Sequence, residues 1–353
     1  MELEQTYDRA ASYQENYGRG PQFGAERRAV PQVPRKEFLG CPVRSRVGIA
    51  AGLLLNSEWI LGYAERGFDL LTYKTVRSSF RPCYELPNWV FVEESPDEAG
   101  TYFVTDDLPD DPREVSSSVC FGMPSMAPEV WRKDVARAKG GLAEGQLLIV
   151  SVVATPLEDW TLEMAAADFV QCAVWARDAG ADVVEANFSC PNVCSSEGSI
   201  YLDAESSGYI ASEIRKAIGQ TPLLIKTGHY ADEGRLGAYL HALDGLADGV
   251  TLVNCLIGKV IHRDGSPIFG EAFVEAGVLG RTIHDPCVKS VRKTADMIER
   301  DGLRLQVAAV GGAATADDVA RYFDAGADAV MMGSAPMYLP DLAAELKGTR
   351  PDF

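Results

Sequence analysis

A short polar string, Asn187-Phe-Ser-Cys-Pro-Asn192, carries the densest set of chemically useful groups in this chain. It presents two carboxamides, a hydroxyl and a thiol around a proline that stiffens the turn. Asn254 adds a carboxamide after a later apolar run. These groups could converge on one small, planar, polar ligand. The alternative interpretation is an ordinary polar turn.

Two lysines end apolar runs: Lys74 closes Leu71-Thr-Tyr-Lys, and Lys226 closes Leu223-Leu-Ile-Lys. Desolvating an ammonium costs several kcal/mol, roughly, unless an anion or a dipole compensates. The pair therefore indicates an anionic ligand near the ends of two strands. The alternative is that each side chain extends over the rim into solvent.

Small residues follow the last two apolar runs, at Gly311-Gly312 and at Gly333-Ser334, and each pair precedes a helix-like segment. Backbone N–H groups and helix N-termini in such turns can surround a phosphate. Gly277 and Gly280 could add N–H groups from the preceding loop. The alternative is a set of tight turns that serve packing alone.

The elements that must position these residues alternate between short apolar runs and amphipathic stretches. This pattern predicts an α/β fold, a (β/α)8 TIM barrel with long rim insertions and a polar N-terminal arm. The expected strands are Val47–Ala51, Phe68–Lys74, Gln146–Val153, Asp182–Phe188, Pro222–Lys226, Gly249–Asn254, Leu305–Val310 and Asp328–Met332. The expected helices include Thr161–Ala179, Ala204–Ile218, Gly234–Leu243, Pro286–Asp301 and Ala316–Ala325.

The chain divides into two parts. Residues 1–46 lack apolar periodicity, so we expect an extended arm that lies on the body or on a partner subunit. Residues 47–353 form the barrel, with a rim insertion at about 75–145 and a second long connection at 255–281. Both long connections follow strands, so both should lie at the C-terminal rim, where barrel enzymes carry their chemistry.

Composition excludes several classes of partner. The 353 residues carry a formal net charge of −18, from 51 acidic and 33 basic residues, which disfavours nucleic acid and anionic membranes. No segment approaches the roughly 20 apolar residues that span a bilayer, and the polar start predicts a cytoplasmic protein. The eight cysteines show no C-x-x-C spacing, so neither a metal site nor a disulfide framework is expected.

The string Asn187-Phe-Ser-Cys-Pro-Asn-Val193 resembles the active-site motif of the dihydroorotate dehydrogenases. The resemblance covers roughly residues 36–337. It continues in order through Ala50-Ala-Gly52, Tyr73-Lys-Thr75, Ile225-Lys226, Val253-Asn254, Gly277 to Gly280, Gly311-Gly312 and Gly333-Ser334.

The resemblance implies FMN in the barrel mouth, with its phosphate near Gly312 and Ser334 and both lysines near the isoalloxazine. By the same resemblance, Cys190 is the catalytic base, as in class 1 members, and Lys74 is the second catalytic residue. The residues implied for the cofactor are Ala50, Ala51, Gly52, Lys74, Thr75, Asn187, Lys226, Asn254, Gly277, Gly280, Gly311, Gly312, Gly333 and Ser334. Those implied for the substrate are Lys74, Phe121, Gly122, Met123, Asn187, Asn192, Asn254 and Cys255.

The reaction that the resemblance implies is two-electron chemistry at a C–C bond of dihydroorotate or a relative, in pyrimidine metabolism. A hydride moves to or from flavin N5, and Cys190 exchanges the proton on the adjacent carbon. A homodimer is expected because class 1 relatives are dimers. The external electron donor or acceptor is not identified, because the chain has neither an iron–sulfur cysteine cluster nor a dinucleotide-binding glycine signature.

One segment departs from the family pattern. Class 1 members carry Asn-x-x-Gly-x-x-Asn where this chain reads Val119-Cys-Phe-Gly-Met-Pro-Ser125. The Val119 side chain cannot form a hydrogen bond, and a buried polar ligand atom without a partner costs about 1–3 kcal/mol. Cys255 also stands where a hydroxyl is usual. We therefore hypothesise a substrate that is less polar at one edge, such as another cyclic amide or an unsaturated carboxylic acid of specialised metabolism.

Other interpretations remain open at this point. A flavin-free lyase or isomerase would use the glycine turns for a phosphorylated substrate and a lysine for a Schiff base. A third possibility is a barrel kept as a binding or assembly partner. Arg77 and Arg81 could place the loop that bears Cys190, attract a carboxylate, or belong to a solvated face.

Overall fold

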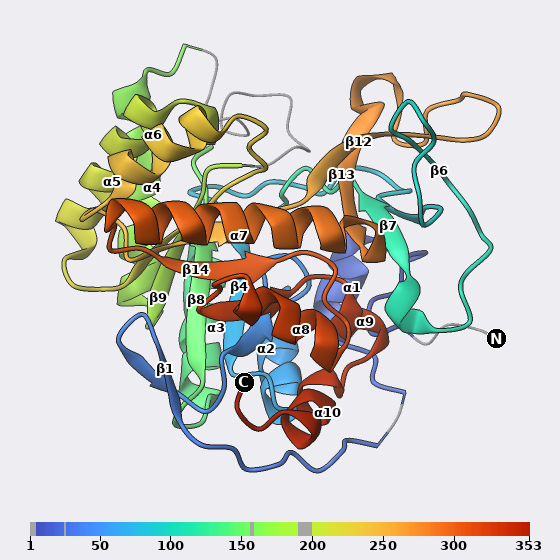
Figure 1. The fold of residues 1–353 in the computed structure, drawn as a ribbon, viewed down its shortest axis with the longest axis horizontal. Coiled ribbons are helices and arrows are strands. Elements are labelled where there is room, and N and C mark those ends of the chain that lie inside the picture. Colours follow the sequence, from blue (N-terminus) through green and yellow to red (C-terminus); the bar gives the residue numbers. More distant parts are fainter. Residues whose placement is uncertain (1–4, 25, 156–158, 190–199) are drawn as a thin grey trace.

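Eight parallel strands close into a barrel in the computed structural model, which describes residues 5–24, 26–155, 159–189 and 200–353 (Figure 1). The strands follow chain order around the barrel, and all eight expected strands are present. They are β3 (Val47–Ile49), β4 (Leu70–Val76), β8 (Leu147–Val152), β9 (Val183–Asn187), β10 (Leu223–Lys226), β11 (Gly249–Leu252), β14 (Gln306–Val310) and β15 (Ala329–Met332). The (β/α)8 TIM barrel predicted from the sequence is confirmed.

Helices surround the barrel, and the five expected ones are present within a residue or two at each end. They are α4 (Leu162–Asp178), α5 (Ala204–Ile218), α6 (Glu233–Leu243), α7 (His284–Asp301) and α8 (Ala316–Asp324). Apolar spacing did not single out α2 (Ser57–Glu65), α3 (Pro128–Gly141), α9 (Ala335–Tyr338) and α10 (Leu342–Thr349). Of the helices in the described ranges, none combines the length and the apolar character needed to cross a membrane.

The two Asp-Ala-Gly-Ala-Asp endings show how short turns return the chain from helix to strand. The glycine of each ending has a positive φ, 106° and 92°, as an αβ turn with glycine after the helix requires. The final aspartate then caps a neighbouring strand, since Asp182 accepts a hydrogen bond from the Leu148 N–H at 2.8 Å. Asp328 does the same for the Val307 N–H at 2.7 Å.

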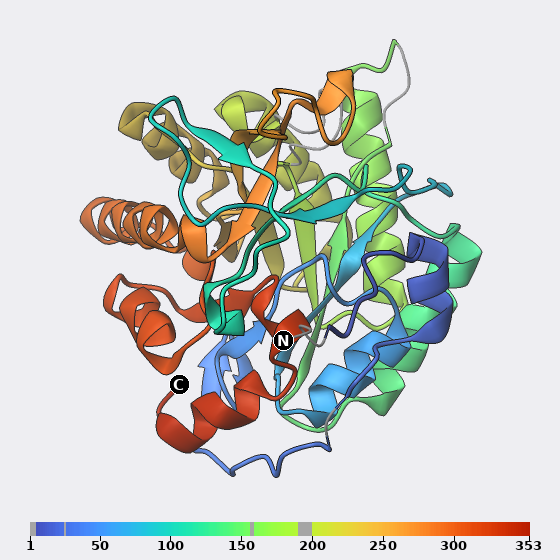
Figure 2. The ribbon, with the colours of Figure 1, turned by 90° about the vertical axis from the view of Figure 1, so that its right-hand side faces the viewer.

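The two long connections combine in a second sheet over the C-terminal rim (Figures 1 and 2). Its order is β5-β7-β13-β12-β6, so the two strands of the second connection, β13 and β12, lie between β7 and β6 of the first. The strands are β5 (Trp89–Phe91), β6 (Thr101–Phe103), β7 (Ser116–Val119), β12 (Leu256–Ile261) and β13 (Glu275–Gly280); short 3-10 turns lie at Pro112–Glu114, Glu271–Phe273 and Arg281–Ile283. The segment 75–145 therefore contains rim strands β5, β6 and β7 and, in addition, the barrel helix α3.

The N-terminal arm is more structured than expected. It contains helix α1 (Tyr13–Arg19) and a hairpin of β1 (Lys36–Phe38) and β2 (Cys41–Val43). The hairpin places Phe38 and Val43 in one apolar cluster with inward residues of the barrel such as Leu147. The hairpin thus covers the end of the barrel opposite the rim sheet with apolar side chains.

Candidate active site

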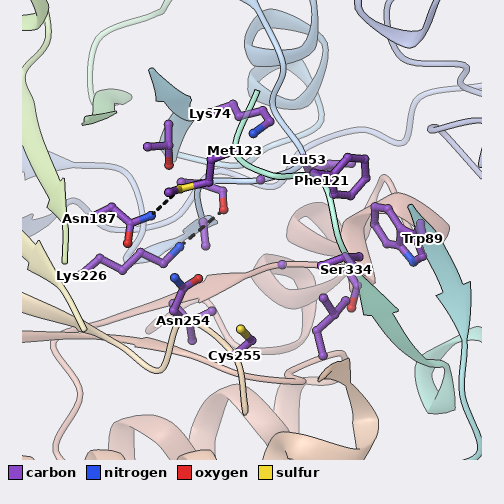
Figure 3. A pocket seen from close by; sticks show the side chains of 18 of the residues that line it. Leu53, Lys74, Trp89, Phe121, Met123, Asn187, Lys226, Asn254, Cys255 and Ser334 are labelled. Atoms are coloured by element: carbon purple, nitrogen blue, oxygen red, sulfur yellow. Dashed lines mark hydrogen bonds between the residues drawn. The ribbon is translucent and has the colours of Figure 1, made fainter. Parts of the chain in front are cut away.

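A pocket lies over the C-terminal ends of the barrel strands, with residues of the rim sheet and of the N-terminal arm in its walls (Figure 3). It brings together most of the residues singled out from the sequence, although they come from all parts of the chain. The predicted site residues that line it are Ala50, Ala51, Gly52, Lys74, Thr75, Phe121, Gly122, Met123, Asn187, Lys226, Asn254, Cys255, Gly280, Gly311, Gly312, Gly333 and Ser334.

Three predicted site residues stand apart from this group. Gly277 is absent from the lining; it lies within β13, where its carbonyl accepts a hydrogen bond from the Ser118 hydroxyl at 3.0 Å. Cys190 and Asn192 lie outside the described residues. Their roles therefore remain predictions.

Both lysines reach the pocket from the ends of barrel strands. Lys226 is almost fully buried and donates to the Ala51 carbonyl oxygen at 3.5 Å, the long limit of a hydrogen bond. Lys74 is 8% exposed, and its ammonium lies 5.7 Å from the centre of the Tyr13 ring, within cation–π range. The alternative in which these lysines reach solvent over the rim is wrong, and the pocket carries two buried ammonium groups.

The polar turn after β9 organises two asparagines. Asn187 accepts a hydrogen bond from the Ser189 N–H at 3.2 Å and directs its amide N–H toward the Met123 sulfur at 3.6 Å. Asn254 donates to the Ser189 carbonyl and, at 3.4 Å, to the Ser189 hydroxyl. Ser189 thereby sets the direction of carboxamides from two different strand ends, and both carboxamides line the pocket.

Glycines form the opposite wall. Gly312 has φ of 66°, and a Cβ there would lie 2.3 Å from the Gly280 carbonyl oxygen, so only glycine fits at this position. Behind the wall, His284 Nδ1 lies 3.1 Å from the Gly311 carbonyl oxygen, and Asp318 accepts hydrogen bonds from N–H groups at the start of α8. The glycine turns are therefore held from the protein side, while their other side faces the pocket.

Arg77 has a structural task that the sequence left open. It is fully buried, so the interpretation as part of a solvated face is wrong. Its guanidinium donates to the Met123 carbonyl at 3.1 Å, to the Ala154 carbonyl at 2.7 Å and to the Thr155 hydroxyl at 3.3 Å. Arg77 therefore ties the loop after β7, which carries Met123 into the pocket, to the end of β8.

Sequence reasoning named Phe121 but missed the other rings of an aromatic wall. Tyr7 of the arm lies with its ring centre 5.7 Å from Trp89 and 6.0 Å from Phe121, and all three rings line the pocket. Burial raises the pKa of the Tyr7 hydroxyl well above its usual range, so this hydroxyl stays protonated. Tyr13 lines the pocket beside Lys74. No periodicity marks Tyr7, Tyr13 or Trp89. For the two arm residues, the available signal was the number of tyrosines in an otherwise polar arm.

The pocket therefore has a cationic end and a glycine-lined end. Figure 3 shows Lys74, Asn187 and Lys226 on one side and Ser334 on the other, with Trp89 and Phe121 beside Ser334. Such a cavity can accept an elongated planar ligand with an anionic group at its far end. Fold and pocket together define a TIM-barrel enzyme whose chemistry takes place at the C-terminal rim.

Comparison with known proteins specifies the family. The model of the family described as "Dihydroorotate dehydrogenase" matches residues 147–346. The dihydroorotate dehydrogenase of Dictyostelium discoideum is 32% identical over 356 residues, which cover 96% of this chain and 95% of that protein. This chain belongs to the dihydroorotate dehydrogenase family, whose members are oxidoreductases acting on a CH–CH bond.

Two further matches are more restricted. The catalytic subunit of dihydroorotate dehydrogenase B (NAD(+)) from Maridesulfovibrio salexigens is 30% identical over 173 residues, 48% of this chain and 53% of that protein. A crystal structure of a dihydroorotate dehydrogenase from Eimeria tenella, in complex with ferulenol, superposes with a TM-score of 0.69. It covers 87% of this chain and 80% of its own at 17% identity, and supports the fold.

Replacing Arg77 with Met should lower the free energy of unfolding by about 2–4 kcal/mol, because two buried carbonyls lose a charged donor. Chemical denaturation measures this change. The matched control is Arg137→Met on the outer face of α3. That arginine is 63% exposed, and its ion pair with Glu58 is long at 3.8 Å. The control should change the free energy of unfolding by no more than about 0.5 kcal/mol. Equal effects of the two substitutions would show that Arg77 does not brace the loop.

Proposed function

We propose that this chain is an FMN-dependent oxidoreductase that transfers two electrons at a C–C bond of a small cyclic amide or carboxylate of the dihydroorotate type. One observation carries the proposal: two buried lysines enter a single pocket whose opposite wall consists of glycine turns and Ser334. Ammonium groups buried in the wall of a cavity suit an anionic ligand, because an anion offsets part of their desolvation cost of several kcal/mol, roughly.

The residues of the pocket fit FMN. A Cβ added at Gly52 or Gly333 would meet no atom within 4 Å, so both glycines border open space in the cavity. The backbone around Gly312 and Ser334 would hold the phosphate, and Lys226 would lie at the polar edge of the ring. When bound, FMN supplies the hydride acceptor or donor of the reaction.

The protein's own groups would then handle charge, orientation and the proton. The ammonium of Lys226 stabilises negative charge on the ring, and that of Lys74 attracts an anionic substrate. Asn187 and Asn254 orient the amide edges of the substrate through hydrogen bonds that Ser189 helps to direct. By the resemblance to class 1 members, the Cys190 thiol exchanges the proton at the carbon next to the site of hydride transfer.

The cellular setting is proposed by analogy with the family. We assign the chain to pyrimidine metabolism or to a specialised pathway that uses the same chemistry, in the cytoplasm and as a homodimer. The high excess of acidic residues supports a small-molecule substrate rather than a nucleic acid. The external electron donor or acceptor stays unassigned; among the curated relatives, one kind is named for NAD(+).

Val119 favours a substrate that is less polar than dihydroorotate at one edge. It lies at the end of β7, beside Trp89 in the register of the rim sheet, and lines the pocket. Phe121 and Tyr7 extend the apolar surface on the same side. A carbonyl or N–H of the ligand directed at this wall would lose a hydrogen bond, whereas an apolar substituent would pack against the rings.

The first test concerns the flavin. Purified protein should be yellow, with about one FMN per chain, and Gly333→Val should leave a folded but colourless protein because the new side chain enters the cavity. Absorption spectra and circular dichroism measure both properties. Gly140→Ala on α3 also meets open space but lies outside the pocket, so its flavin content should match the parent protein. A colourless parent that binds phosphate esters but not FMN would favour the flavin-free lyase or isomerase.

The second test concerns the substrate. Val119→Asn should lower the KM for dihydroorotate by about tenfold, equivalent to about 1.4 kcal/mol, because it restores a hydrogen-bonding side chain at the apolar edge. Steady-state orotate formation with each variant measures this. Val119→Ala changes the side-chain volume without adding a partner and should bring no such gain. Efficient orotate formation by the parent protein, unchanged in Val119→Asn, would refute the hypothesis of a less polar substrate.

A further inference from the structure

Barrel closure sorts the inward side chains into layers of four, contributed by alternate strands. The strand registers define these layers directly. Thr72 on β4 pairs with Ile149, and Ile149 pairs with Val183; two residues further along β9 is Glu185. The step is thus to cross two strands along the register and then to move two residues forward. Repeated around the barrel, it returns to Thr72, as closure requires. The layer consists of Thr72, Glu185, Thr251 and Met331.

This layer lies directly below the floor of the pocket. Lys226 pairs with Asn187, two residues beyond Glu185 on β9, and both Lys226 and Asn187 line the pocket. Because side chains alternate along a strand, Glu185 points to the same inner face as Asn187, deeper in the barrel. Thr251 is the direct register partner of Lys226 on the other side. Glu185 therefore lies in the layer of inward side chains directly below that of Lys226.

The layer is polar and fully buried. Neither carboxylate oxygen of Glu185 has a hydrogen-bond partner among the described residues, and the same holds for the hydroxyls of Thr72 and Thr251. All three side chains have 0% exposure. A polar group in this state costs about 1–3 kcal/mol, and an ionised carboxylate costs far more. Because three such groups share one layer, we infer that a common hydrogen-bond partner is bound between them, which removes the cost of burying each one unpaired.

Water is the partner that this chemistry accepts. A buried water makes about three hydrogen bonds and can donate to a carboxylate while it binds hydroxyls and an ammonium. The nearest cation by register is Lys226, whose hydrogen bond to the Ala51 carbonyl is long at 3.5 Å. A water held by Glu185 and the threonines can link that ammonium to a negative charge from below.

We propose that Glu185 is a positioning residue that, together with Thr72 and Thr251, holds buried water beneath the pocket floor and through it fixes and partly neutralises the Lys226 ammonium. The inference rests on the proposed function in that Lys226 faces the flavin ring. Its consequence is that the protein offers less net positive charge to the reduced ring than two lysines alone would provide. Glu185 thus sets the electron affinity of the cofactor without touching it.

A crystal structure of the parent protein tests the water site independently of the flavin. Ordered water should lie within hydrogen-bond distance of Glu185 and of at least one threonine hydroxyl, whether or not FMN is bound. A dry layer would overturn the proposal. The water site can be observed in the protein without FMN, whereas the colour of the protein shows whether FMN binds. A failure of the water proposal can therefore be distinguished from a failure of the proposed flavin chemistry.

The charge of Glu185 is tested by the midpoint potential of bound FMN. Glu185→Gln keeps the shape and removes the charge, so the equilibrium constant for two-electron reduction should rise by at least about tenfold, a shift of about 30 mV to more positive potential. Glu299→Gln, the same charge change on the exposed face of α7, should leave the potential unchanged. An unchanged potential in yellow Glu185→Gln protein would show that Glu185 is neutral or uncoupled from Lys226, and would overturn the proposal.

Discussion

The stagger between parallel strands, fixed by barrel closure, is the constraint on which the rest of this structure depends. For every two strands crossed around the barrel, the residues at one level shift forward by two positions along the chain. Only certain positions can therefore share a layer. The same rule that stacks Leu224 and Ile149 in the apolar interior brings Lys226 to the pocket floor and places Glu185 one layer below it. The chemistry of the pocket is therefore tied to the register of the strands.

The two ends of the barrel are covered in different ways: one is sealed by apolar side chains, and the other holds the pocket. The hairpin of the N-terminal arm packs apolar side chains such as Phe38 against the interior, which seals one end. At the other end, the rim sheet and the tyrosines of the arm form walls but leave a cavity. Arg77 braces this open end, because it binds carbonyls of the loop after β7 and of the segment after β8, both at the C-terminal rim.

Much of the fold was predictable because it depends on local patterns. Apolar runs and the glycine-aspartate endings located all eight strands, since both signals act over a few residues. Residues that end strands were also predictable: Lys74, Asn187 and Lys226 line one pocket because parallel strands deliver their ends to one rim.

Features that depend on contacts between distant segments could not be predicted. The rim sheet pairs residues such as Val119 and Gly277, which are far apart in the chain, and no periodicity connects them. Gly277 was assigned to the phosphate site from its motif, but that pairing places it in a strand outside the pocket lining. Tyr7 belongs to a segment without an amphipathic pattern, so its place in the pocket follows only from tertiary packing.

Electron density for the purified protein crystallised with orotate tests the central claim most directly. We expect an isoalloxazine ring above the floor formed by Ala50, Lys226 and Val310, with its phosphate at Gly312 and Ser334 and the sulfur of Cys190 facing the far side of the ligand. A map in which this cavity holds no flavin, or in which that sulfur turns away from the ligand, would contradict the claim.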